Sequence, residues 1–156
     1  MQNSTSKVRV LTGTAMLGAV AAVLMYLEFP IPIMPAFVKL DVSELPALIA
    51  SFAYGPVSGI LVCLIKNLIK LPSTSTAAVG ELFNFVMGAL FVGVAGLIYK
   101  RNKTRKGAIV GALLGALVMA VVSVPYNYFI VYPAYVVMYH LPLDAIIGMY
   151  QAINPN

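Results

Sequence analysis

The segment of residues 37–59 reads FVKLDVSELPALIASFAYGPVSG, and it places Lys39, Asp41 and Glu44 in a short polar island between two long apolar runs. Across its 156 residues the chain is 61% hydrophobic and only 10% charged, whereas a soluble domain is about 25% charged. So little polar surface predicts an integral membrane protein. Burying a charge at membrane depth costs several kcal/mol unless the charge is paired or used. The polar island of residues 37–44 therefore predicts a functional site for a polar solute.

The length of the chain limits what else it can contain. A membrane-spanning helix needs about 20 apolar residues, so 156 residues allow about five or six helices in a single transmembrane domain, residues 1–156. No GxxxxGK(S/T) phosphate loop occurs. With one cysteine, Cys63, and one histidine, His140, an internal disulfide, a cysteine-based metal cage and a histidine-dependent triad are not expected. We expect no enzyme activity, no metal and no cofactor.

The basic residues predict the orientation of the chain in the membrane. Most of them lie before the first apolar run or in one short loop: Lys7, Arg9, Lys100, Arg101, Lys103, Arg105 and Lys106. Because basic loops stay in the cytoplasm, we expect a cytoplasmic N-terminus in a cell membrane. The polar island, the loop of residues 72–80 and the tail beyond residue 131 then lie outside. No aromatic residues interleave with the basic cluster, so nucleic acid is not an expected partner.

The apolar runs and their breaks predict five helices, at residues 8–27, 42–53, 57–71, 81–99 and 107–131. Prolines at positions 30, 32 and 35 stiffen the loop after the first helix. The second and third helices flank the turn Tyr54-Gly55-Pro56. Neither is long enough to span comfortably, so we expect both to line a cavity or to tilt. The aromatic, proline-broken tail is expected to lie at the membrane interface.

Small residues recur four apart on two predicted helices, as Ala15 and Ala19, as Gly18 and Ala22, and as Gly107, Gly111 and Gly115. Such a stripe allows another helix to approach closely. On the first helix the alternative is that small residues are simply common in membrane helices. On the fifth helix, packing within the bundle is the favoured role.

Two pairs of polar or aromatic residues are candidates for contact with a ligand. Glu81 opens the fourth helix, and Asn84 lies on the same face at i+3. Together they supply a charged acceptor and an amide for a sugar-like or heterocyclic ligand, although Glu81 could instead complement the helix dipole. Asn127 follows Tyr126 in an apolar setting and needs a partner. That partner is either a ligand or the backbone freed by Pro125.

The third helix carries two lysines with different expected roles. Lys66 lies deep enough to pair with a buried carboxylate, whereas Lys70 is expected to extend toward the membrane interface. Before the second helix, Asp41 or Ser43 is expected to cap its first turn, with Asp41 favoured. Asp41 and Glu44 form the one close pair of titratable groups, which argues against catalysis.

Two segments of the sequence resemble a known family: KLDVSELPALIASFAYGPVSGILVCLIKNLIKL (residues 39–71) and STSTAAVGELFNFVMGALFVGVAGLIYK (residues 73–100). The opening K-(L/I)-D-(V/I)-S-x-(L/I)-P, the YGPxxG turn, the following Lys-Asn pair and the VGEL start of the fourth helix resemble the RibU family. Its members are the riboflavin-specific substrate-binding (S) components of energy-coupling factor (ECF) transporters. The likeness extends from the first helix through PYNYF.

The resemblance implies an all-α integral membrane bundle of six helices that binds one riboflavin near its extracellular face. This chain carries about five of them and ends where the sixth would begin, so we expect a truncated form. The family likeness also implies that the loop after the first helix closes over the isoalloxazine ring. The implied substrate-binding residues are Phe37, Lys39, Leu40, Val42, Glu81, Asn84, Tyr126 and Asn127.

The same resemblance implies partners. Ala15 and Ala19 look like the family's alanine motif, which packs on a transmembrane coupling protein, and two cytoplasmic ATPases complete the transporter in a prokaryotic plasma membrane. Two alternatives stay open from the sequence. One is the same architecture with another vitamin, such as thiamin or biotin. The other is a small membrane enzyme or a facilitator that works alone.

Overall fold

The computed structural model of the protein describes residues 2–27, 29–30, 39–40, 42–73, 78–139 and 148. The helices are α1 (Gln2–Tyr26), α2 (Glu44–Tyr54), α3 (Pro56–Lys70), α4 (Val79–Arg101), α5 (Arg105–Tyr126) and α6 (Tyr132–Tyr139). A 3-10 turn, η1 (Leu71–Ser73), follows α3, and a π-helical turn, η2 (Asn127–Val131), joins α5 to α6. Two short strands, β1 (Phe29–Pro30) and β2 (Lys39–Leu40), pair antiparallel. All five predicted helices are present.

Four of the described helical segments are long and apolar enough to cross a membrane: Ser6–Tyr26, Pro56–Ser73, Val79–Arg101 and Arg105–Val131. The expectation that the third helix is too short was wrong, because η1 extends α3 to an 18-residue segment. The expectation holds for α2, which has 11 residues. Large apolar side chains such as Leu11, Leu113 and Val124 are exposed on the outside of the bundle. They form the surface that faces lipid.

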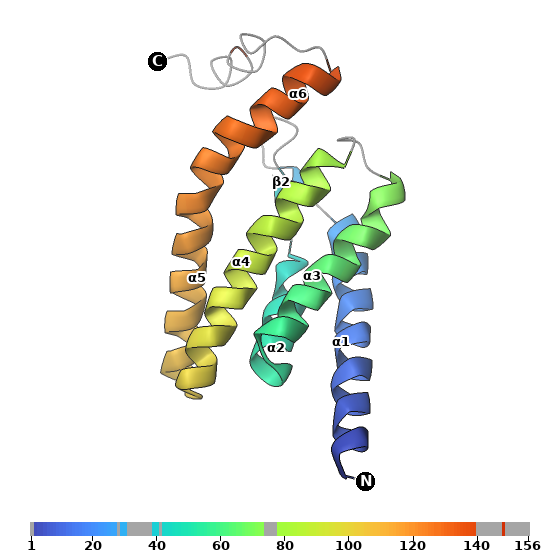
Figure 1. Cartoon of the computed structure of the whole chain (residues 1–156), viewed down its shortest axis with the longest axis vertical. Helices are drawn as coiled ribbons and strands as arrows, with labels where there is room; N and C mark the ends of the chain where they lie inside the picture. Colours follow the sequence, from blue (N-terminus) through green and yellow to red (C-terminus); the bar gives the residue numbers. More distant parts are fainter. Residues whose placement is uncertain are drawn as a thin grey trace.

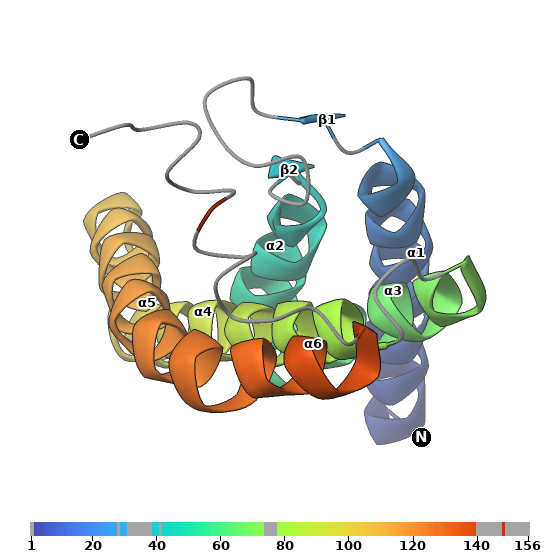
Figure 2. The ribbon, with the colours of Figure 1, turned by 90° about the horizontal axis from the view of Figure 1, so that it is seen from above.

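Helices α3, α4 and α5 lie in a row, with α1 and α2 on one face of α3 (Figures 1 and 2). Helix α3 packs against α1, α2 and α4, while α5 packs against α4. The shared core is made largely of small side chains: Ala21, Ala47, Ala50, Val62, Cys63 and Val92. Because these side chains are short, the helix backbones approach one another closely.

The α2–α3 turn shows how closely these helices pack. Gly55 has a φ of 107°, a conformation that L side chains rarely adopt. After the turn, a Cβ added at Gly59 would lie 2.6 Å from Ser51 Cβ. The Ser51 hydroxyl donates a hydrogen bond of 2.7 Å to the Val92 carbonyl of α4. A single serine therefore joins the hairpin to the next helix.

The glycine stripe of α5 packs inside the bundle, as predicted. Gly107, Gly111 and Gly115 are all buried. A Cβ added at Gly111 would lie 2.8 Å from the Ala95 carbonyl oxygen, and one at Gly115 would lie 2.6 Å from the Phe91 carbonyl oxygen. Any larger residue would push α5 away from α4.

The helical path continues beyond the predicted end at residue 131. Helix α5 is regular to Tyr126 and then passes through the π turn into α6, which bends across the end of the bundle (Figure 1). Pro125 lies within α5 and Pro133 within α6. Because proline has no N–H, each removes one hydrogen bond from the ladder, and such sites favour a bend or a π turn. Helix α6 has 8 residues, too few to span a membrane.

Candidate functional site

A buried lysine occupies the junction of α2, α3 and α4. The Lys66 side chain is 0% exposed, and its Nζ lies 2.6 Å from Ser43 Oγ and 2.6 Å from Glu44 Oε1. An ammonium without a partner at this depth would be very costly. The predicted pairing of Lys66 with a carboxylate is therefore confirmed, and the partner is Glu44 at the start of α2.

The carboxylate of Glu44 has two further neighbours, and the side chain keeps 24% of its surface exposed. Cys63 Sγ lies 3.5 Å from Glu44 Oε2 and donates to it. On α4, a Cβ added at Gly88 would lie 2.5 Å from Oε1 and 2.9 Å from Oε2. Gly88 thus leaves room for the carboxylate. We call Ser43, Glu44, Cys63 and Lys66 the Lys66 cluster; its polar contacts join α3 to the start of α2, and Gly88 of α4 packs against it.

Ser43 does not cap the second helix with its side chain, contrary to one of the two predicted caps. Ser43 occupies the N-cap position of α2 but makes no side-chain capping hydrogen bond. Its hydroxyl instead accepts from Lys66, because a charged donor competes successfully with a neutral backbone N–H. Asp41, the favoured cap, lies outside the described residues, so its role stays a prediction.

Asn67, the neighbour of Lys66, was not among the predicted site residues, but its side-chain oxygen is buried. Its Nδ2 donates to the Cys63 carbonyl at 2.8 Å, while its buried Oδ1 has no hydrogen-bond partner among the described residues. Buried acceptors are nearly always paired with protein, water or ligand. The signal available in the sequence was the adjacent Lys-Asn pair within an apolar run.

The predicted residues of α4 and α5 lie near the start of α4 and the end of α5, at one end of the bundle (Figure 1). Glu81 is 7% exposed in the first turn of α4, and Asn84 is half-buried one turn later. The rings of Phe83 and Tyr126 are 5.6 Å apart between centroids, which places the start of α4 beside the end of α5. This is the end of the bundle at which β2 lies (Figure 1).

Asn127 has a local partner. Its Nδ2 donates to the Ser123 carbonyl at 2.9 Å. The predicted hydrogen bond to nearby backbone is thus present, but its acceptor is not the Val121 carbonyl that Pro125 leaves without a donor. Since an asparagine amide also offers an acceptor oxygen, this bond leaves Asn127 able to accept from a ligand.

The residues around the loop after α1 are only partly described. The β1–β2 ladder pairs Phe29 with Leu40 and Pro30 with Lys39, so it closes the base of the loop. Val42 is 45% exposed, immediately before the fully buried Ser43. Phe37 lies outside the described residues.

The two small-residue stripes of α1 face in different directions. Gly18 and Ala22 are buried, and a Cβ added at Gly18 would lie 3.0 Å from the Ile65 side chain of α3. Ala15 and Ala19 are exposed. The first stripe therefore packs within the bundle, and the second leaves a flat strip on its surface.

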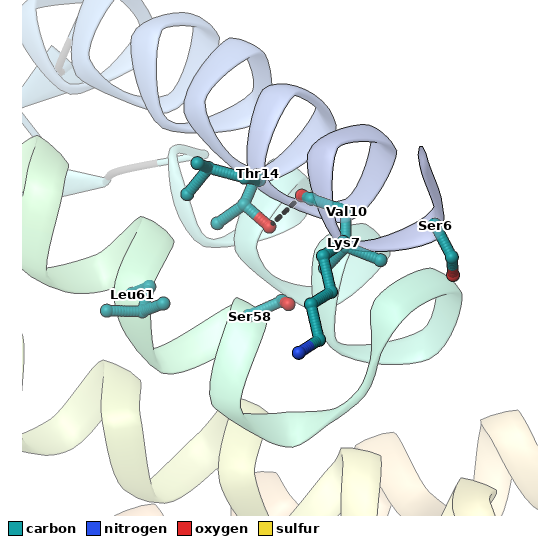
Figure 3. Close-up of a pocket in the computed structure, with 7 residues that line it drawn as sticks. Ser6, Lys7, Val10, Thr14, Ser58 and Leu61 are labelled. Atoms are coloured by element: carbon teal, nitrogen blue, oxygen red, sulfur yellow. Dashed lines mark hydrogen bonds between the residues drawn. The ribbon is translucent and has the colours of Figure 1, made fainter. Parts of the chain in front are cut away.

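A groove of about 290 Å³ lies between α1 and α3 toward the other end of the bundle (Figure 3). It is lined by Ser6, Lys7, Val10, Leu11, Thr14, Ser58 and Leu61. The Thr14 hydroxyl donates to the Val10 carbonyl at 2.7 Å, so its donor is already used within the helix. The predicted substrate-binding residues do not line this groove.

These features define a multi-pass membrane protein that brings buried polar groups to one end of an apolar helical bundle. The chain belongs to the family of substrate-specific components of ECF transporters, because the model of that family matches residues 9–154. It is a component of a transporter and not an enzyme.

Two named transporters and one solved structure are similar to this chain. It is 39% identical to the riboflavin transporter RibU of Staphylococcus aureus over 127 residues, which cover 81% of this chain and 67% of that protein. It is 38% identical to the riboflavin transporter FmnP of Bacillus subtilis over 139 residues, which cover 87% of this chain and 73% of that protein. A solved S component of a bacterial ECF transporter has a TM-score of 0.77 and 35% identity, covering 98% of this chain and 86% of that one.

Proposed function

We propose that the chain is the riboflavin-binding subunit of an ECF-type vitamin importer. It captures riboflavin at the extracellular face and delivers it together with an ATP-driven coupling module. The observation that carries this proposal is the 38–39% identity to two riboflavin transporters across 81–87% of the chain. The S-component fold supports it, as does the position of the start of α4 and the end of α5, which carry Glu81, Asn84, Tyr126 and Asn127, at the end of the bundle where β2 lies (Figure 1).

The chemistry of the site suits this vitamin. Riboflavin has a flat aromatic ring system and a polyhydroxyl chain, and a good pocket for such a molecule is mostly apolar with a few placed polar groups. Leu40 and Val42, with Phe37 and Lys39, are proposed to cover the ring system. Glu81, Asn84, Tyr126 and Asn127 are proposed to bind the hydroxyl groups or the polar ring edge.

The direction of insertion is part of the proposal. Lys7 and Arg9 are exposed near the start of α1, and a second exposed basic cluster lies in residues 100–106 between α4 and α5. Figure 1 shows both at the end of the bundle opposite β2. By the positive-inside rule this end is cytoplasmic, which leaves the predicted riboflavin site outside. The surface strip at Ala15 and Ala19 is then the proposed contact with the transmembrane coupling protein, which works with two cytoplasmic ATPases.

A fluorescence titration tests this function. Riboflavin fluorescence is expected to be quenched at submicromolar concentration by the detergent-purified protein, because a buried flavin ring packs against apolar and aromatic groups. Glu81→Gln and Asn127→Ala are each expected to weaken binding by about tenfold or more, since each leaves a buried ligand hydroxyl with a poorer partner. Quenching should not be competed by thiamin or biotin. Thermal stabilisation by one of those vitamins, without riboflavin quenching, would contradict the assignment.

A further inference from the structure

We propose that Lys66 is a positioning residue for riboflavin: it fixes the start of α2, directly after the proposed ring contacts Leu40 and Val42 at the end of the loop of residues 28–42. This inference rests on the proposed function. It adds a role for residues that are not among the predicted riboflavin contacts. Two members of the Lys66 cluster, Ser43 and Glu44, directly follow that loop in the sequence. Ser43, Cys63 and Lys66 of this cluster are 0% exposed, and the Glu44 side chain is 24% exposed.

The loop is held at two successive points along the chain. The β1–β2 ladder fixes Lys39 and Leu40. Three residues after Leu40, Ser43 Oγ accepts from Lys66 at 2.6 Å, and Glu44 Oε1 does so at the same distance. Val42, which is exposed, lies between these two points. Its carbonyl accepts a hydrogen bond from Leu45 N–H at 3.1 Å, which ties the Val42 backbone to the first turn of α2 that the cluster holds.

The second part of the argument concerns the face of α4 against which the cluster lies. Glu81, Asn84 and Gly88 are spaced at i, i+3 and i+7, so they lie on one face of the helix. The Glu44 carboxylate packs against Gly88, two turns from Glu81. The cluster thus sets the start of α2 in register with the face that carries the two proposed polar contacts.

Stability alone is a weak reason for the ion pair. Buried ion pairs can often be replaced by apolar residues of similar size with no loss of stability, because desolvation offsets the attraction between the charges. Charged groups inside a membrane are expected to serve function. A positioning role for the Lys66 cluster gives a function to a pair that has no predicted contact with the solute.

A glycine pair on α4 offers a matched test. Gly88→Ala would push on the Glu44 carboxylate, whereas a Cβ at Gly93, on the same helix, meets only Ile60 Cδ1 at an ordinary 3.6 Å. We expect Gly88→Ala to raise the riboflavin dissociation rate about tenfold and Gly93→Ala to change it by about twofold at most. Dissociation is measured on the monodisperse fraction, alongside the melting temperature without ligand and the absorption spectrum of the bound flavin.

A second variant keeps the test decisive if Gly88→Ala disturbs folding. Glu44→Leu combined with Lys66→Met removes both charges together, so neither charge is left without its counter-ion. We expect it to retain a melting transition but to lose riboflavin affinity by about tenfold or more. Wild-type affinity in this folded double variant, or equal dissociation rates in the two glycine variants, would overturn the positioning role. A wild-type protein that fails to quench riboflavin would instead contradict the proposed function.

Discussion

Two lysines one turn apart on α3 have opposite surroundings. Lys66 is buried and bound to Ser43 and Glu44. Lys70 is only half-buried, donates to the Met25 carbonyl at 3.1 Å, and places its Nζ 5.9 Å from the centre of the Tyr26 ring. The same residue type therefore joins α3 to the start of α2 at one depth and to the end of α1 at another.

These surroundings predict that replacing each lysine by methionine lowers the free energy of unfolding by different amounts. Lys66→Met leaves the Glu44 carboxylate without its main partner, and breaking a buried pair in this way costs about 3–5 kcal/mol. Lys70→Met loses a hydrogen bond and a cation–π contact at a partly exposed site, which costs about 1–2 kcal/mol. Melting temperatures of the two variants in detergent, without ligand, compare these losses. Equal shifts would contradict the description of Lys66 as a buried, paired charge.

At the scale of elements, α1 presents one small-residue stripe to α3 and another to its surroundings. Gly18 lies against Ile65, and Ala22 is 4% exposed. Ala15 and Ala19, only three residues away from them along the helix, are exposed. One helix therefore provides a packing face for its own bundle and a strip free for another protein.

This division predicts separable variants of α1. Ala15→Leu with Ala19→Leu is expected to leave riboflavin quenching unchanged but to prevent co-purification with the coupling protein and ATPases, because two isobutyl groups would fill the flat strip. Gly18→Leu is expected to lower the melting temperature instead, because its side chain would meet Ile65. Normal co-purification of the Ala15→Leu, Ala19→Leu double variant with the coupling protein would contradict the proposed contact.

Features that depend on residues close together in the sequence could be predicted, and features that depend on residues far apart in the sequence could not. The helices followed from long apolar runs, and the pairing of Lys66 followed from its depth. The partner of Lys66 lies 22 residues earlier, on another helix, and the space that Gly88 leaves for it exists only after α2 and α4 pack. The π turn after Tyr126 lies between Pro125 and Pro133, and the separate effects of two prolines on one continuous helix are hard to combine from the sequence. The roles of the proposed riboflavin contacts stay predictions, and Phe37 lies outside the described residues.

At the scale of the whole molecule, the exposed basic residues and the proposed riboflavin contacts lie toward opposite ends of the bundle. The exposed basic groups of residues 100–106 lie at one end, and buried Glu81 lies toward the other. The native thiol, Cys63, is 0% exposed. A cysteine introduced at either end can therefore be labelled without competition from Cys63.

The proposed orientation predicts the labelling pattern of such cysteines. Ser73→Cys, just after α3, is expected to react with a membrane-impermeant maleimide on intact cells, because its end of the bundle faces outward. Lys103→Cys, between α4 and α5, is expected to react only after the membrane is permeabilised. The unmodified protein should stay unlabelled in both conditions. The reverse pattern would place the N-terminus outside.

The alanine-rich core has a consequence for the cost of binding. Alanine loses no rotamer entropy when it is buried, so Ala21, Ala47 and Ala50 bring α1, α2 and α3 together without that penalty. Close backbone contacts, rather than the ordering of long side chains, define the spacing of these helices. A scaffold ordered in this way does not need to be ordered again when a solute arrives, so more of the contact energy is available as affinity.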